Sequence, residues 1–146
     1  MDTHGRSPKV LYVEDDAGLA ALYIARFKQE GFEVRHCPDG EQALQVGREY
    51  RPDLIIVDLM MPTLSGFDAI EMFRSVPETS GAVIVVMSAM SQQQDIDTAL
   101  QRGADDYLVK SQVLIDDVVV RLKHHLTNMG FSLAGGTSSD EAPSAA

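Results

Sequence analysis

Polar side chains stand directly after short apolar runs at four places in the sequence. They are Glu14, Asp15 and Asp16 after VLYV, Asp58 after LIIV, Ser88 after VIVVM, and Lys110 after YLV. Apolar runs of this length, followed by polar residues, are typical of strands that end at an exposed edge. A carboxylate is expensive to bury without a partner. The position of Asp58 therefore indicates that positive charge lies close to it.

These residue types, brought together, can perform phosphoryl transfer. Several carboxylates in one crevice repel one another, and a hard divalent cation such as Mg²⁺, which prefers oxygen ligands, removes that repulsion. A carboxylate can then attack phosphorus while the metal and a lysine neutralise the phosphoryl oxygens. Asp58 is the candidate nucleophile, Lys110 the candidate cation, and Ser88 a hydroxyl donor at the same rim.

Strand-like and helix-like segments alternate along the chain, as needed to bring these residues to one edge. Strands are predicted at residues 10–13, 32–36, 54–57, 82–87 and 107–109, with a helix after each. The caps expected for these helices are Asp39, Ser65 and Ser91 at N-termini and Gly31 and Gly103 at C-termini. The pattern predicts an α/β, doubly wound, five-stranded parallel sheet with helices on both faces. In such sheets ligands bind beyond the carboxyl ends of the strands.

The composition indicates one soluble domain in a reducing compartment. The chain has 146 residues, a formal net charge of −10 and a single cysteine, Cys37. The negative charge argues against a nucleic-acid surface, and the lone cysteine excludes an internal disulfide framework. No apolar run is long enough to span a bilayer, and the start is not a signal peptide. We expect a cytoplasmic domain at residues 9–126, an extension at 1–8, and a flexible tail or linker rich in Gly, Ser and Ala at 127–146.

Four motifs in order resemble the response-regulator receiver domains of two-component signalling, the CheY-like superfamily. They are VLYVEDD at residues 10–16, DLIIVDLMMPTLSGFD at 53–68, VIVVMSA at 83–89 and GADDYLVK at 103–110. The match covers about residues 9–126. The resemblance implies a flavodoxin-like sheet with strand order 2-1-3-4-5.

The resemblance also implies how the acidic residues divide the work. Asp58 would accept a phosphoryl group from the phosphohistidine of a sensor histidine kinase or histidine phosphotransfer protein. Asp15 would bind Mg²⁺, for which Mn²⁺ can substitute, together with Asp58, with Glu14 through water, and with the backbone carbonyl of Met60. Asp16, the third acid of the run, can simply cap the first helix, and this role is compatible with a metal site formed by its neighbours.

The remaining site residues would read out the phosphoryl group. Ser88 would donate a hydrogen bond to it, Lys110 would form an ion pair with it, and Tyr107 would be the switch aromatic. The surface formed by residues 91–103, 107–109 and 115–126 would then change its contacts with an output domain or protein, and a homodimer through it is possible. The chain would be a signalling switch and not a metabolic enzyme.

One residue departs from the family pattern and keeps alternatives open. Ser111 follows Lys110, where the family usually has a proline in a cis peptide bond. A non-proline cis bond costs about 2.5–4 kcal/mol, so a trans bond is expected, and it can displace Lys110. Ser111 leaves open a receiver-like interaction module that needs no phosphorylation. A small aspartyl-phosphate phosphatase is a separate alternative. Met60 stands where such phosphatases carry a second acid, which argues against the latter.

Overall fold

A parallel five-stranded sheet forms the centre of the molecule. The computed structural model describes residues 5–133. The strand order is β2-β1-β3-β4-β5, which confirms the predicted doubly wound α/β fold. The strands are β1 (Lys9–Val13), β2 (Glu33–Cys37), β3 (Leu54–Val57), β4 (Val83–Ser88) and β5 (Asp106–Val109).

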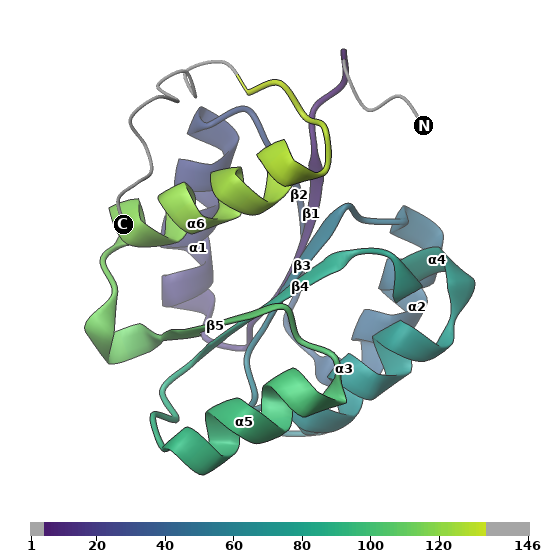
Figure 1. Cartoon of the computed structure of the whole chain (residues 1–146), viewed down its shortest axis with the longest axis vertical. Helices are drawn as coiled ribbons and strands as arrows, with labels where there is room; N and C mark the ends of the chain where they lie inside the picture. Colours follow the sequence, from purple (N-terminus) through teal and green to yellow (C-terminus); the bar gives the residue numbers. More distant parts are fainter. Residues whose placement is uncertain (1–4, 134–146) are drawn as a thin grey trace.

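Helices cover both faces of the sheet (Figure 1). One face carries α1 (Ala17–Gln29) and α6 (Ile115–Asn128), and the other carries α2 (Gly40–Tyr50), α3 (Gly66–Ser75), the short α4 (Pro77–Ser80) and α5 (Gln93–Arg102). None of the helices within residues 5–133 combines the length and the apolar character needed to cross a membrane.

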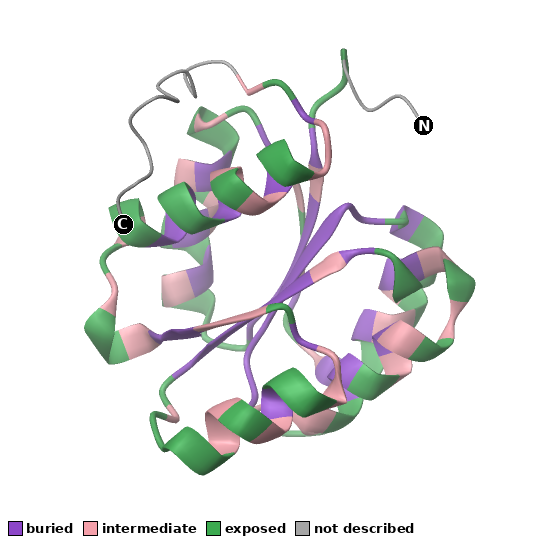
Figure 2. Cartoon of the chain, in the orientation of Figure 1, coloured by how far each residue is buried: buried purple, intermediate pink, exposed green. Residues whose placement is uncertain are grey.

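The sheet separates two apolar cores because strand residues alternate between its faces. Tyr12 and Ile56 pack toward α1 and α6, whereas Leu11 and Ile55 pack toward α2 and α3. Figure 2 shows the central strands as the most continuously buried part of the chain. Each fully buried aliphatic side chain contributes about 1.5–3 kcal/mol. The strands therefore form a rigid base, and their carboxyl ends are fixed points.

Most of the predicted helix boundaries are confirmed. The side chains of Asp16, Asp39 and Ser65 accept hydrogen bonds from backbone amides of α1, α2 and α3, respectively. Gly31 and Gly103 follow α1 and α5 with φ values of 90° and 126°, which favour glycine.

The structure differs locally from the predictions, and most strand bounds shift by one residue, as in β4, which is observed at Val83–Ser88. Ser91 does not cap α5; Gln92 precedes that helix and makes no side-chain cap hydrogen bond. Strand β2 begins at Glu33, one residue later than expected. Residues 77–80 form α4, which was not predicted although Pro77 at its first turn is a recognised start signal.

Packed structure extends beyond residues 9–126 at both ends. Arg6 forms an ion pair with Asp53 at 2.9 Å, and its guanidinium lies 5.2 Å from the ring centroid of Phe131. Helix α6 ends at Asn128, and Phe131 is buried in the core on that side. The expected tail at 134–146 and residues 1–4 lie outside the described residues.

Asp106 is expected to stabilise the domain in a pH-dependent way. Burial of its carboxyl works to raise the pKa, but the hydrogen bond with His125 and the charge of Arg121 outweigh burial, and the pKa is lowered. A lowered pKa adds stability above the unfolded-state pKa of about 4 and loses it as the pH falls through the folded-state value. Asp106→Asn should therefore lower the free energy of unfolding at pH 7 by about 1–2 kcal/mol, and the difference from wild type should shrink below about pH 4.

Denaturant unfolding across pH measures this effect, with Asp97→Asn as the control. Asp97 is exposed and accepts a hydrogen bond from Gln93 within its own helix, so its replacement should change little at any pH. A difference between Asp106→Asn and wild type that stays constant from pH 7 to pH 3 would contradict the prediction.

Candidate functional site

The strand register brings the predicted site residues to one edge of the sheet. Val13 of β1 pairs with Val57 of β3, so the acidic run after Val13 lies beside Asp58. Ser88 of β4 pairs with Val109 of β5, and Lys110 is the next residue. All four strand ends therefore meet at the carboxyl edge, as the sequence predicted.

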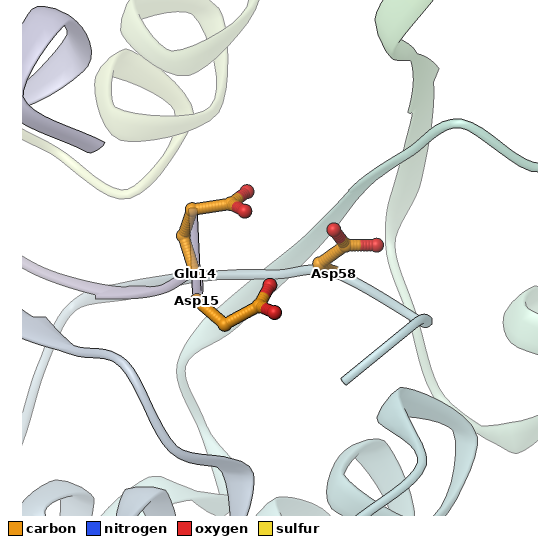
Figure 3. A group of neighbouring side chains, drawn as sticks. All are labelled: Glu14, Asp15 and Asp58. Carbon is orange, nitrogen blue, oxygen red and sulfur yellow. The ribbon is translucent and has the colours of Figure 1, made fainter. Parts of the chain in front are cut away.

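Three carboxylates gather at this edge. Glu14, Asp15 and Asp58 each offer an oxygen, and these oxygens lie within 4.8 Å of one another. Figure 3 shows the three side chains side by side on the ends of neighbouring strands. Glu14 is only 1% exposed and Asp58 5% exposed, whereas Asp15 is open to solvent. Two of the three are thus buried acids that need a cation.

Lys110 supplies positive charge to both buried acids. Its Nζ lies 2.7 Å from Asp58 Oδ2 and 2.9 Å from Glu14 Oε1. None of the peptide bonds within the described part of the chain is cis, so the Lys110–Ser111 bond is trans. Residues Lys110–Gln112 form a 3-10 turn, η1, which the sequence did not predict. The trans bond at Ser111 therefore leaves Lys110 in contact with Asp58.

Burial and pairing act in opposite directions on the charges of this cluster. Burial raises the pKa of the Glu14 carboxyl, and the hydrogen bonds from Lys110 and from the Asp16 amide only partly oppose it. Burial works to lower the pKa of the Lys110 ammonium, but its contacts with Asp58 and Glu14 outweigh burial and raise it. Lys110 therefore remains charged at neutral pH, and Glu14 bears an electrostatic penalty that a further cation would relieve.

The Asp58 carboxylate is oriented by its own loop. The amide of Met60 donates to Asp58 Oδ1 at 3.0 Å, while Oδ2 faces Lys110. Behind the loop, the first residue of α3 is Gly66, where an added Cβ would lie 2.3 Å from the Asp58 carbonyl oxygen. Only glycine permits this approach. The strand-end pattern does not mark Gly66 as a site residue, although a glycine immediately after the Ser65 cap is a readable signal.

Ser88 of β4 and Tyr107 of β5 lie on the opposite side of β3 from the acidic run that follows β1. Ser88 is completely buried, and its Oγ accepts a hydrogen bond from the Met90 amide at 3.2 Å. The Tyr107 hydroxyl donates to the Met90 carbonyl at 2.7 Å. Burial raises the pKa of the Tyr107 phenol, with Ser88 opposing the change. Met90 thus joins the two predicted switch residues through its backbone, a link that side-chain patterns do not encode.

The donor set fits a hard divalent cation. Carboxylate oxygens from three residues within 4.8 Å are the ligands that Mg²⁺ prefers, and the raised pKa of Glu14 shows that Lys110 alone does not offset the burial of negative charge there. Asp16 lies outside this group: its carboxylate caps α1, accepting from the Leu19 amide at 3.0 Å. The helix-cap reading of Asp16 is therefore correct.

Comparisons with known proteins identify the family. A family model described as "Response regulator receiver domain" matches residues 10–123. The transcriptional regulatory protein PrrA of Mycobacterium leprae is 40% identical over 141 residues, which are 97% of this chain and 58% of that protein. The DNA-binding response regulator MtrA of Mycobacterium bovis is 40% identical over 110 residues, 75% of this chain and 46% of that protein. The chain thus spans about half the length of these relatives.

Solved structures agree with the match. The receiver domain of the sensor histidine kinase PA1611 of Pseudomonas aeruginosa, described with a magnesium ion coordinated in its active-site cleft, has a TM-score of 0.73 and 27% identity, covering 81% of this chain and 96% of its own. The BeF3-activated receiver domain of Klebsiella pneumoniae RstA has a TM-score of 0.75 and 27% identity, covering 81% and 97%. With the motifs, the fold and the acidic edge in agreement, the chain belongs to the response regulator receiver domain family.

Proposed function

We propose that Asp58 accepts a phosphoryl group from a phosphohistidine donor in a Mg²⁺-dependent reaction, and that the chain acts as a phosphorylation switch. The observation that carries the proposal is the pairing at Asp58: a nearly buried carboxylate with a lysine 2.7 Å from one oxygen and a backbone amide 3.0 Å from the other. Such a carboxylate is held still and its charge is offset, as a nucleophile for phosphorus requires.

The proposed step forms one bond and breaks one. A carboxylate oxygen of Asp58 bonds to phosphorus while the phosphorus–nitrogen bond of the phosphohistidine breaks, and its electron pair returns to the imidazole. Mg²⁺, held by Asp15, Asp58 and, less directly, Glu14, would neutralise developing charge on the phosphoryl oxygens. Lys110 pairs with one of these oxygens. The Ser88 hydroxyl, now an acceptor from Met90, turns to donate to another.

The change at Ser88 would reach the surface through Tyr107. Because Ser88 Oγ and the Tyr107 hydroxyl both bond the backbone of Met90, drawing Ser88 toward a phosphoryl group alters the loop that starts α5. The proposed output surface is therefore α5, β5 and α6, and we place the switch in the cytoplasm. MtrA is named as DNA-binding, but this chain matches only 46% of that protein. We therefore do not assign DNA binding to the residues of this chain.

The test is to incubate the full chain with Mg²⁺ and acetyl phosphate and to weigh the intact protein. We expect an adduct of one phosphoryl group that requires the metal. Borohydride reduction, which converts an aspartyl phosphate to homoserine, should mark Asp58 in the digested peptide. No adduct with acetyl phosphate or with any phosphohistidine donor would favour the phosphorylation-independent module. Continuous release of phosphate from many substrates would favour a phosphatase.

Two exposed leucines, one in α1 and one at the start of α6, indicate where the phosphohistidine donor docks. Leu22 is 58% exposed and Leu114 71% exposed. Arg26, one helical turn after Leu22, pairs with Asp116 of α6 at 2.7 Å, two residues after Leu114, so both leucines belong to the same α1–α6 side. Both helices begin just beyond the carboxyl edge that carries Asp58. We propose that a donor protein covers these leucines when it delivers its phosphohistidine.

Leu22→Asp should slow phosphoryl transfer from a protein donor but not from a small-molecule donor. We expect it to slow phosphoryl transfer from the histidine phosphotransfer protein that serves wild type by at least about ten-fold, the effect of losing one well-packed contact residue. Transfer from acetyl phosphate should be unchanged, since Asp58 and Lys110 are untouched. The matched control is Leu100→Asp, which introduces the same charge at a 42% exposed leucine of α5 on the other face of the sheet. Equal slowing with both phosphate donors would contradict the docking proposal.

A further inference from the structure

The loop that leaves β3 carries the backbone groups that orient Asp58. Residues 59–64 connect Asp58 to the Ser65 cap of α3, and the amide of Met60 within this loop bonds Asp58 Oδ1. The α3 end of the loop is fixed, because the Gly66 amide donates to the Leu59 carbonyl at 3.0 Å. The outer part of the loop, which contains Met60 and Thr63, is exposed. The contact between Gly66 and Leu59 does not hold this part in place.

Within residues 5–133, one side-chain hydrogen bond ties the outer part of this loop to another element. The Thr63 hydroxyl donates to Asp39 Oδ1, 24 residues away in sequence. Asp39 lies in the turn between β2 and α2, and the same oxygen accepts the Glu41 amide at 2.8 Å as the cap of α2. The two bonds together lower the pKa of the Asp39 carboxyl. Capping α2 needs only the Glu41 amide, so the bond to Thr63 is an additional, tertiary contact.

The two loops also touch through Gly40. A Cβ added at Gly40 would lie 2.9 Å from Met61 Cε and 3.1 Å from the Leu64 carbonyl oxygen. Gly40 is buried and its φ is not in the left-handed region. A side chain at residue 40 would therefore press on the Met61 side chain and on the Leu64 carbonyl, and the restriction there comes from space and not from backbone conformation. The start of α2 therefore packs closely against Met61 and Leu64, the residues on either side of the Pro62–Thr63 pair.

We infer that Asp39 and Thr63 are positioning residues for phosphoryl transfer. Their hydrogen bond, called the latch below, restrains the β3–α3 loop, so that the Met60 amide keeps the Asp58 carboxylate oriented for the metal and the phosphoryl donor. Neither side chain reaches the acidic cluster, so they act through the backbone of Met60. The inference rests on the proposed function of Asp58.

Thr63→Val tests the latch with little change in side-chain volume. Loss of one charge-assisted but exposed hydrogen bond should weaken Mg²⁺ binding, measured by calorimetry on the unphosphorylated chain, by about three- to ten-fold. The rate of phosphorylation by acetyl phosphate at limiting Mg²⁺ should fall by a similar factor. Hydrogen exchange of the Met60 amide should accelerate, while amides of β3 stay protected. Thr63→Ser, which keeps the hydroxyl, should restore all three quantities.

Two further variants make the outcome decisive. Gly40→Ala should displace the same loop from the other side and weaken Mg²⁺ binding as Thr63→Val does. Thr98→Val is the matched control: its hydroxyl bonds the Gln94 carbonyl within α5, so it should leave Mg²⁺ binding unchanged. Wild-type Mg²⁺ affinity and Met60 exchange in Thr63→Val would overturn the latch. Failure of the wild-type chain to form an adduct would overturn the function of Asp58 instead, so the two failures are distinguishable.

Discussion

Asp58→Asn should abolish the phosphate adduct formed with Mg²⁺ and acetyl phosphate. The amide oxygen of Asn can still accept the Met60 amide bond that Asp58 Oδ1 accepts, so the loop should keep its shape. The amide lacks the negative charge and the nucleophilic oxygen that phosphoryl transfer needs. Intact-mass measurement is expected to show no adduct where wild type shows one.

The neighbouring acids are not expected to replace Asp58. Glu14 is buried, its carboxyl pKa is raised, and its two oxygens face Lys110 and the Asp16 amide. Asp15 is exposed, and within the described residues its carboxylate accepts no orienting hydrogen bond like that from the Met60 amide to Asp58. Asp15→Asn is the informative comparison: it removes a proposed metal ligand but leaves Asp58 in place, so its adduct should reappear at higher Mg²⁺. An adduct on Asp58→Asn as large as that on wild type would show that another residue is the acceptor.

The sequence predicted the elements and the site edge because both depend on local patterns. Near-continuous apolar runs mark strands covered on both faces, and polar residues follow Val13, Val57 and Val109 because the strands end there at the carboxyl edge, where Glu14 and Asp58 pair with Lys110. Once the order of the strands is assumed, the meeting of Glu14, Asp58 and Lys110 follows from parallel pairing. The same logic places Ser88.

Contacts that depend on backbone or on side-chain reach were not predictable in this way. The bond from Tyr107 to the Met90 carbonyl uses an atom that every residue possesses, and the approach of Gly66 to Asp58 depends on the path of a loop. The consequence of Ser111 could not be predicted for the same reason. The sequence shows that no proline follows Lys110, but it does not show where the Lys110 ammonium lies when that peptide bond is trans. Its position, 2.7 Å from Asp58, required the structure.

Lys110→Met should impair both stability and phosphorylation. The ammonium is the positive partner of Glu14 and Asp58, and removing one partner of a buried ion pair costs about 3–5 kcal/mol. Because the Lys110 side chain is itself 23% exposed, we expect the lower part of this range, about 3 kcal/mol, in chelator-treated protein. Phosphorylation by acetyl phosphate should fall by at least about a hundred-fold, the loss of one charge-assisted contact in the transition state.

Mg²⁺ should restore stability but not phosphorylation in Lys110→Met, which separates the two roles. A cation that binds only the folded chain raises the free energy of unfolding, and the two buried acids without Lys110 should bind it more tightly than in wild type. Lys123→Met is the matched control, because Lys123 is also 23% exposed and pairs with Glu30 at 2.6 Å. Arg26 still pairs with Glu30 after that change, so its loss of stability should be smaller, independent of Mg²⁺, and without effect on the adduct. Lys110→Met could instead match Lys123→Met in its loss of stability, in the independence of that loss from Mg²⁺ and in its normal phosphate adduct. The contact between Lys110 and Asp58 would then have no part in the chemistry of this site.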